Sequence, residues 1–214
     1  MTNFIPVFPL GIVVYPGQDL NLHIFEPRYR QLIQECFESR KPFGIPVVVE
    51  NELKELGTLM EVVEISKVYE DGKVDIKTRG LRVFRLLELI REIPDKLYSG
   101  GIVSYPENNL IQESRWLMEK VLTGLKELHR LLQVDKKFKK PESSLLSYDV
   151  APHIGLTLVE EYEFLGLMDE LQRQEYLKRH LTRTLPMLAE MEMLKEKIKL
   201  NGHFRNIEPF QFNL

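Results

Sequence analysis

The chain has 214 residues, of which 43% are hydrophobic and 29% are charged, and its formal net charge is −3. This composition fits an ordinary globular protein and lacks the charge excess typical of proteins that bind nucleic acids or membrane surfaces. Cys36 is the only cysteine, which excludes an intramolecular disulfide and a cysteine-based metal cluster within one chain. The N-terminal segment has no basic leader and is broken by Pro6, Pro9 and Pro16, so we expect a cytoplasmic protein without a signal peptide or membrane span.

Short β-prone runs, separated by Pro and Gly, dominate the chain from residue 4 to about residue 105. The alternation within these runs predicts a small, mostly antiparallel sheet or barrel. Asp71-Gly72 lies between two of the runs, at a spacing that is typical of a tight hairpin. The runs lie at 12–15, 43–49, 58–69, 73–78, 81–90 and 101–105.

One helix is expected within this β-rich part, at 26–39. Pro27 suits the first turn of a helix, where its missing N–H group would have no partner. Apolar residues follow at helical spacing, namely Tyr29, Leu32, Ile33, Cys36 and Phe37. This face of the helix is expected to be buried, with Cys36 as an inert thiol.

The pattern becomes helical after about residue 110. Helices are expected near 111–132, around 143–168 and from about 169 to 200, with a lysine-rich break at 136–141 between the first two. Asn201-Gly202 is expected to end the last helix. Its apolar stripe is expected to face the core, and the residues of the stripe are Leu181, Leu185, Leu188, Met191, Leu194 and Ile198. The sequence therefore predicts an α+β fold with a β-rich part at 1–110, a helical part at 111–200 and a tail at 201–214.

The segment FPLGIVVYPGQDLNLHIFEPRYRQLIQECFES at 8–39 closely resembles the opening signature of the Lon protease N-terminal (LON substrate-binding) domain family. The resemblance continues in order with FG at 43–44, GT at 57–58, DGKVDIKTRG at 71–80 and RVF at 82–84. It implies a PUA-like β subdomain followed by a helical subdomain. It also implies a non-catalytic role in recognising unfolded or damaged polypeptides or a protein partner.

The residues that carry this resemblance are interpreted as mainly structural, because prolines and glycines fix turns and aromatic residues fill cores. They are Pro9, Pro16, Gly17, His23, Phe25, Glu26, Pro27, Arg28, Tyr29, Gly44, Gly57, Thr58, Gly72, Gly80 and Phe84.

The sequence contains no local motif for ATP hydrolysis, peptide hydrolysis or dinucleotide binding. Its five histidines are not spaced with Cys, Asp or Glu as metal ligands usually are. We therefore expect no ATPase or peptidase activity, no catalytic residue, no cofactor and no metal. A general base formed by His23 and Glu26 is the enzymatic alternative, and a structural role for both residues is favoured.

Two further segments could bind a partner, and the sequence leaves the oligomeric state open. Lys136, Lys137, Lys139 and Lys140 flank Phe138, a mixture that could contact phosphates and stack on a base. A PUA-like RNA-binding protein is therefore the alternative function, although a solvated loop is the favoured reading. The aromatic residues of the tail are candidates for contact with a protein partner, and they are Phe204, Phe210 and Phe212.

Overall fold

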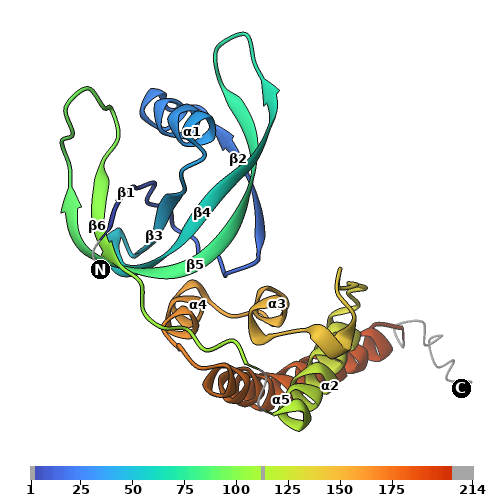
Figure 1. The fold of residues 1–214 in the computed structure, drawn as a ribbon. Helices are drawn as coiled ribbons and strands as arrows, with labels where there is room; N and C mark the ends of the chain where they lie inside the picture. The colour runs from blue at the N-terminus through green and yellow to red at the C-terminus, as the bar shows by residue number, and fades with distance from the viewer. Residues whose placement is uncertain (1–2, 112–113, 204–214) are drawn as a thin grey trace, which may run out of the picture.

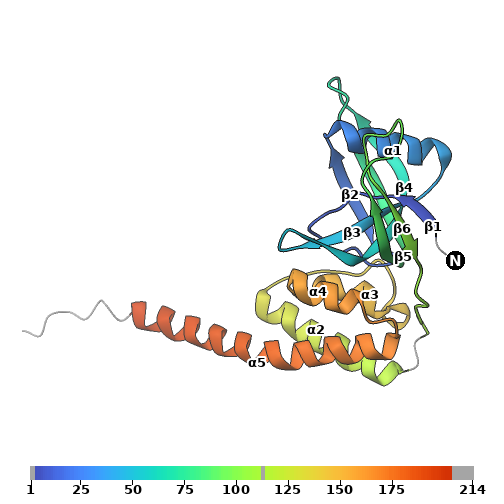
Figure 2. The same cartoon turned by 90° about the vertical axis from the view of Figure 1, so that its left-hand side faces the viewer.

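The computed structural model describes residues 3–111 and 114–203, with side chains described as far as residue 199. A β-rich part lies above a layer of helices, and the last helix extends well beyond the rest of the molecule (Figures 1 and 2). The expected α+β fold, with a mostly antiparallel N-terminal sheet and a helical C-terminal half that ends in a long helix, is confirmed.

In the described part of the chain, six strands form one sheet, in which β2 pairs only with the first half of β5. The rest of the sheet has the order β1-β6-β5-β4-β3, and every pairing between these strands is antiparallel. Residues Val7 and Leu10 form parallel bridges to β3, which bring the two edges of the sheet together. The strands are β1 (Asn3–Pro6), β2 (Asp19–Ile24), β3 (Phe43–Val49), β4 (Glu52–Val68), β5 (Val74–Ile90) and β6 (Gly100–Ser104).

Three details of the sheet differ from the sequence-based expectation. The expected strands at 73–78 and 81–90 are one continuous strand, β5, and strands β1 and β2 were not expected. The apolar run at 12–15 is not a strand. Its side chains are buried because the run passes between two cores: Val14 packs beneath α1, whereas Val13 and Tyr15 face the helical half.

Helix α1 (Pro27–Ser39) lies at the end of the sheet that faces away from the helical layer (Figure 1). Pro27 occupies its first turn, as expected. Four of the five expected apolar positions are buried, but Phe37 remains 41% exposed. The helix ends at Ser39 and is capped by Arg40, which adopts a left-handed conformation with φ of 52°. The N–H groups of Arg40 and Lys41 donate to the last carbonyl groups of the helix, so the chain turns directly into β3.

The helical half is built on α2 (Arg115–Leu132) and α5 (Glu170–His203), which pack side by side (Figure 1). The stretch expected to be helical at 143–168 is broken into short pieces around Pro152 and Gly155, because neither residue favours a helix interior. The pieces are η1 (Glu142–Ser144), α3 (Ser147–Val150), η2 (Ala151–His153) and α4 (Leu158–Leu165). The expected stop at Asn201-Gly202 is wrong, since α5 continues through both residues.

The two halves share a hydrophobic core. Tyr15 and Val83 from the β-rich part pack with Tyr148 and Phe164 from the helical part. The rings of Tyr15 and Phe164 meet edge to face, with centroids 5.4 Å apart. Such aromatic contacts add stabilisation beyond that of the buried area, so the helical half is held firmly against the sheet.

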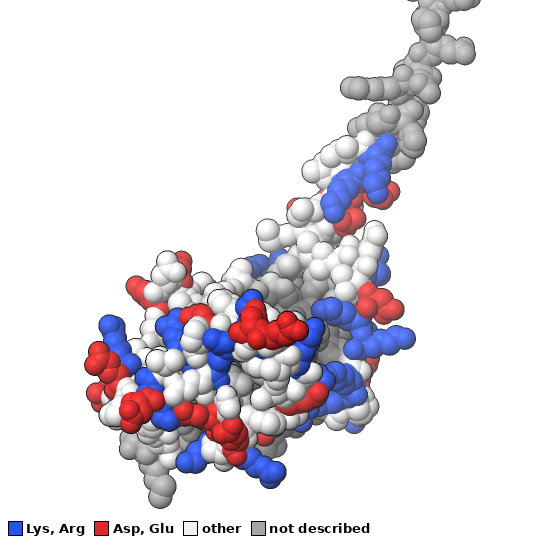
Figure 3. All heavy atoms as spheres, turned by 90° about the horizontal axis from the view of Figure 1, so that it is seen from above, with Lys and Arg blue, Asp and Glu red and all other residues white. Residues whose placement is uncertain are grey.

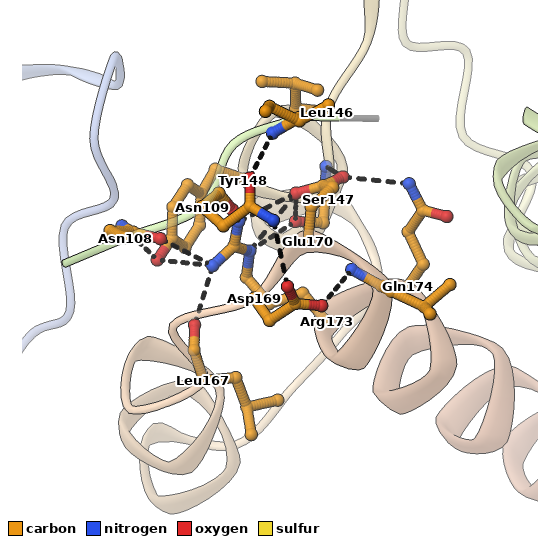
Figure 4. A network of polar contacts seen from close by, with 12 residues as sticks. Asn108, Asn109, Leu146, Ser147, Tyr148, Leu167, Asp169, Glu170, Arg173 and Gln174 are labelled. Carbon is orange, nitrogen blue, oxygen red and sulfur yellow. Dashed lines mark hydrogen bonds and ion pairs between the residues drawn. The ribbon is translucent and has the colours of Figure 1, made fainter. Parts of the chain in front are cut away.

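A buried polar network joins the connection between the halves to the helices (Figure 4). Arg173 of α5 is fully buried and pairs with Glu170, their nearest N and O atoms being 3.0 Å apart. The Arg173 guanidinium also donates to Asn108 Oδ1 and to the carbonyl oxygen of Asn109. On the other side, the carboxylate of Glu170 accepts from both the backbone N–H and the hydroxyl of Ser147 in α3. One arginine therefore fixes three segments that are distant in sequence.

Replacing Arg173 with Ala leaves the Glu170 carboxylate buried without its cation, so we expect a loss of about 3–5 kcal/mol in the free energy of unfolding. Arg130 offers a matched control, because it also pairs with a glutamate three residues earlier, Glu127, but is 68% exposed. Arg130→Ala should cost less than about 1 kcal/mol. Urea unfolding followed by circular dichroism measures both values. Similar losses for the two variants would contradict the role of the network.

Candidate functional site: a groove between helix α1 and strand β4

A groove of about 670 Å³ separates the C-terminal end of α1 from strand β4. Three apolar side chains line it while remaining open to solvent: Phe37 is 41% exposed, Val63 52% and Leu81 40%. Large apolar side chains gathered in a groove with a polar rim are typical of surfaces that bind another molecule. We call this feature the α1–β4 groove.

The apolar lining arises from helical geometry on one wall and from β-bulges on the other. Phe37 follows the buried Cys36 by one position, which rotates its side chain towards the edge of α1. Val63 is the extra residue where the pairing of β4 with β5 shifts register between Val62 and Glu64. Leu81 is the extra residue of β5 between Gly80 and Arg82, at a second register shift. A bulge redirects the side chains of a strand, so both residues face solvent.

The rim of the groove carries both signs of charge, with Arg40 and Lys41 on the helix side and Glu61 on the strand side. Basic and acidic side chains are likewise interspersed over the face of the molecule that includes α1 (Figure 3). A surface of this kind has no continuous basic area for a phosphate backbone. It is compatible with a polypeptide of mixed sequence.

The signature residues are divided between the interior and the surface. Six of the fifteen are buried, namely Tyr29, Gly44, Gly57, Thr58, Gly80 and Phe84. The segment Tyr15-Pro16-Gly17-Gln18 forms a turn closed by the N–H of Gln18 on the carbonyl oxygen of Tyr15, and Gly17 has φ of +83°. A side chain there would be strained, which accounts for the Pro-Gly pair. Phe84 is fully buried, and a Cβ atom on Gly57 would lie only 2.6 Å from its ring.

Other signature residues contribute similar contacts. The hydroxyl of Thr58 donates to the carbonyl oxygen of Val14, and the ring of Tyr29 stacks on that of Phe8. Gly44 also lies against the Phe84 ring, and a Cβ atom on Gly80 would meet the carbonyl oxygen of Tyr15. Pro9 is half-buried, Pro27 begins α1, and Gly72 has φ of +80° in the β4–β5 hairpin.

The structure does not pair His23 with Glu26. His23 Nδ1 lies 2.6 Å from Asp75 Oδ1, while Glu26 forms its ion pair with Arg28 at 2.7 Å. The contact with His23, together with a hydrogen bond from Tyr69, lowers the pKa of Asp75. Phe25 corrects the expectation that signature aromatics fill the core, because its side chain is 59% exposed.

The lysine-rich segment does not present a free aromatic ring. Phe138 packs against the core of the helical half and meets His153 edge to face, with centroids 5.3 Å apart. Lys139 and Lys140 are ion-paired with Asp19 and Asp149, respectively. The ring that could have stacked on a base is therefore already engaged.

The apolar stripe of α5 faces the core over only part of its length. Leu181 is buried and Leu185 and Leu188 pack against the core. Met191, Leu194 and Ile198 are 56%, 58% and 63% exposed, on the part of α5 that extends beyond the body (Figure 2). The expectation of a fully core-facing stripe is thus wrong for its last three positions. The tail residues Phe204, Phe210 and Phe212 lie outside the described residues.

Neither a metal nor a membrane span is suggested by the parts of the chain that the structure describes. No group of three or more His, Cys, Asp and Glu side chains there is arranged to hold a metal ion. Among the same residues, no helix combines the length and the apolar character needed to cross a bilayer.

Burial raises the pKa of the Cys36 thiol from its ordinary value of 9.0 to about 12, with a smaller effect from Glu35. The thiol should therefore react with a disulfide reagent at pH 8 roughly a hundredfold more slowly in the folded chain than in urea. Its contribution to stability is complete below pH 9 and is lost as the pH rises towards 12, because the unfolded chain releases the proton first. Equal reaction rates in the two states would show that Cys36 is accessible.

Comparisons with known proteins bear on the family and the fold of the chain. The family model for the ATP-dependent protease La (LON) substrate-binding domain matches residues 5–183. Lon protease of Escherichia coli K12 is 24% identical over 91% of this chain, and the chain spans 26% of its length. A LON peptidase N-terminal domain and RING finger protein of Schizosaccharomyces pombe is 28% identical over 40% of this chain, which spans 21% of that protein.

Two solved structures share the fold. The Lon N-terminal domain protein of Xanthomonas campestris superposes with a TM-score of 0.59 and 24% identity, over 82% of this chain and 96% of that one. The N-terminal domain of the Mycobacterium avium complex Lon protease gives a TM-score of 0.59 at 16% identity, over 84% and 98% of the two chains. Because the family model covers most of the sequence, the chain belongs to the family of LON substrate-binding domains.

Proposed function

We propose that this protein binds unfolded or damaged polypeptides, or a protein partner, in the α1–β4 groove and does not itself catalyse a reaction. One observation carries the proposal: Phe37, Val63 and Leu81 are all exposed in a single groove on a substrate-binding domain. Unfolded chains expose the apolar side chains that folded proteins bury. A groove with several exposed apolar side chains therefore distinguishes unfolded from folded proteins.

The surrounding charges favour a polypeptide over RNA as the ligand. The groove has Arg40, Lys41 and Glu61 on its rim, whereas RNA binding depends on a predominantly basic surface. Binding that relies on apolar contacts should also persist at high salt, since added ions screen only charge interactions. We place this activity in the cytoplasm, in keeping with a single, buried, reduced cysteine.

Replacing Phe37 with Ala should weaken the binding of a labelled, permanently unfolded protein about tenfold, because an aromatic anchor of an interface commonly contributes at least 1–2 kcal/mol. Phe25→Ala is the matched control, since Phe25 is 59% exposed but does not line the groove. It should leave the affinity unchanged. Fluorescence anisotropy at low and high salt measures the affinities of the unchanged protein and of the two variants for the labelled unfolded protein.

The same titration with single-stranded RNA tests the alternative function. The proposal predicts saturable, salt-tolerant binding of the unfolded protein and no comparable binding of RNA. Salt-sensitive RNA binding that is lost on changing Lys136 and Lys137 to Ala would favour the alternative. The absence of saturable binding to several unfolded proteins, with a folded sample, would overturn the proposed function.

A further inference from the structure

Strand β4 has an open edge beside the α1–β4 groove. The pairing between β3 and β4 ends where Phe43 lies opposite Met60. From Glu61 to Val68, β4 pairs with β5 and, among the described residues, with no other strand. The backbone N–H and C=O groups on that side of β4 are therefore free to pair with another extended chain.

One wall of the groove is formed by the end of α1, and an added strand would lie beside this wall. Its strand side includes Glu61, Val62 and Val63, which belong to the open edge, and its helix side includes Phe37 and Lys41. Helix α1 itself packs on the sheet, where its buried residues share a hydrophobic core with Met60 and Ile76. A new strand would lie about 4.8 Å from β4, with one row of side chains turned towards Phe37.

The bulges of β4 limit how the edge can be used. Register shifts occur between Val62 and Glu64 and between Ile65 and Lys67, and bulges interrupt pairing along an edge. The pairing of an added strand with Glu61–Val68 is thus divided into short stretches, the first of which lies next to α1. Such a contact suits transient capture of a segment better than open-ended association between sheets.

We propose that the α1–β4 groove binds an extended polypeptide segment by β-strand addition to residues Glu61–Val68 of β4. This inference rests on the proposed function and specifies its mode. Backbone hydrogen bonds supply affinity that does not depend on the bound sequence, and alternate apolar side chains contact Phe37 and Val63. A folded protein has already used its backbone groups in its own secondary structure, so the mode selects segments that are unfolded.

The open edge of β2 provides an internal control. Strand β2 also pairs only with β5 among the described residues. None of its residues lines the α1–β4 groove, so an added strand there would have no facing helix wall. If strand addition is specific to the groove, a bound peptide should therefore protect the backbone amides of β4 and leave those of β2 unprotected.

The test uses the full chain and a labelled peptide of about nine residues that alternates valine with serine. Amide hydrogen exchange, followed residue by residue by NMR, should slow about tenfold or more at alternate residues within Glu61–Val68 and stay constant within Asp19–Ile24. Two isomeric peptides, N-methylated either at the valines or at the serines, remove the N–H groups along one edge or the other. At least one isomer should bind about tenfold more weakly than the parent peptide.

The outcomes separate this mode from the proposed function. Binding of unfolded protein that depends on Phe37, with both methylated isomers as strong as the parent and no protection in β4, would overturn strand addition and leave the proposed function standing. The absence of any binding to unfolded protein or peptide would overturn both. Protection that appears equally in β2 and β4 would show nonspecific edge pairing and would also overturn the proposal.

Discussion

The buried ion pair between Arg173 and Glu170 is the contact on which the packing of the helical layer against the connection from the sheet depends. It ties α5 to α3 and to Asn108 and Asn109 in the connection that follows the sheet. A buried charge without a partner is costly. The network therefore favours the arrangement in which Arg173 and Glu170 keep all of these partners. The network and the shared core around Tyr15 and Phe164 together hold the helical layer on the side of the sheet opposite α1 (Figure 1).

This arrangement leaves α1 as the only helix on the far side of the sheet among the described residues. Burying Tyr29, Leu32, Ile33 and Cys36 closes that end of the β-rich core, and the edge of β4 beyond Met60 is left without a strand partner among the described residues. The groove and the open strand edge both arise because α1 covers only part of this end of the sheet. Both are compatible with binding of an extended chain, which brings apolar side chains and unpaired backbone groups at once.

The sequence predicts well those features that depend on local pattern. The helical spacing from Tyr29 to Cys36, the position of Pro27 and the hairpin at Asp71-Gly72 all correspond to the structure. The order of motifs from residue 8 to residue 84 also predicts the family, and hence the sheet followed by helices. The apolar run at 12–15 was wrongly expected to be a strand. Its side chains are buried between two cores, and burial of this kind does not require pairing with another strand.

The candidate site was much harder to predict from the sequence. Phe37 has helical spacing that suggests burial, yet it lies just beyond the covered face of α1. Val63 and Leu81 are exposed by bulges. Bulges depend on the pairing between two strands, so the sequence of either strand alone does not predict them. The Arg173 network likewise depends on partners more than 20 residues away, so a charged residue in a helical pattern gives no sign that it will be buried.

The most direct test of the central claim is to map by NMR which backbone amide signals shift when a permanently unfolded protein is added to saturation. Binding in the α1–β4 groove predicts that the largest shifts cluster at residues 37–41, at and just after the end of α1, and at residues 61–63 of β4, while α2 and the exposed part of α5 change little. Shifts concentrated along α5, or in the lysine-rich segment at 136–141, would contradict the account and place recognition on the helical half.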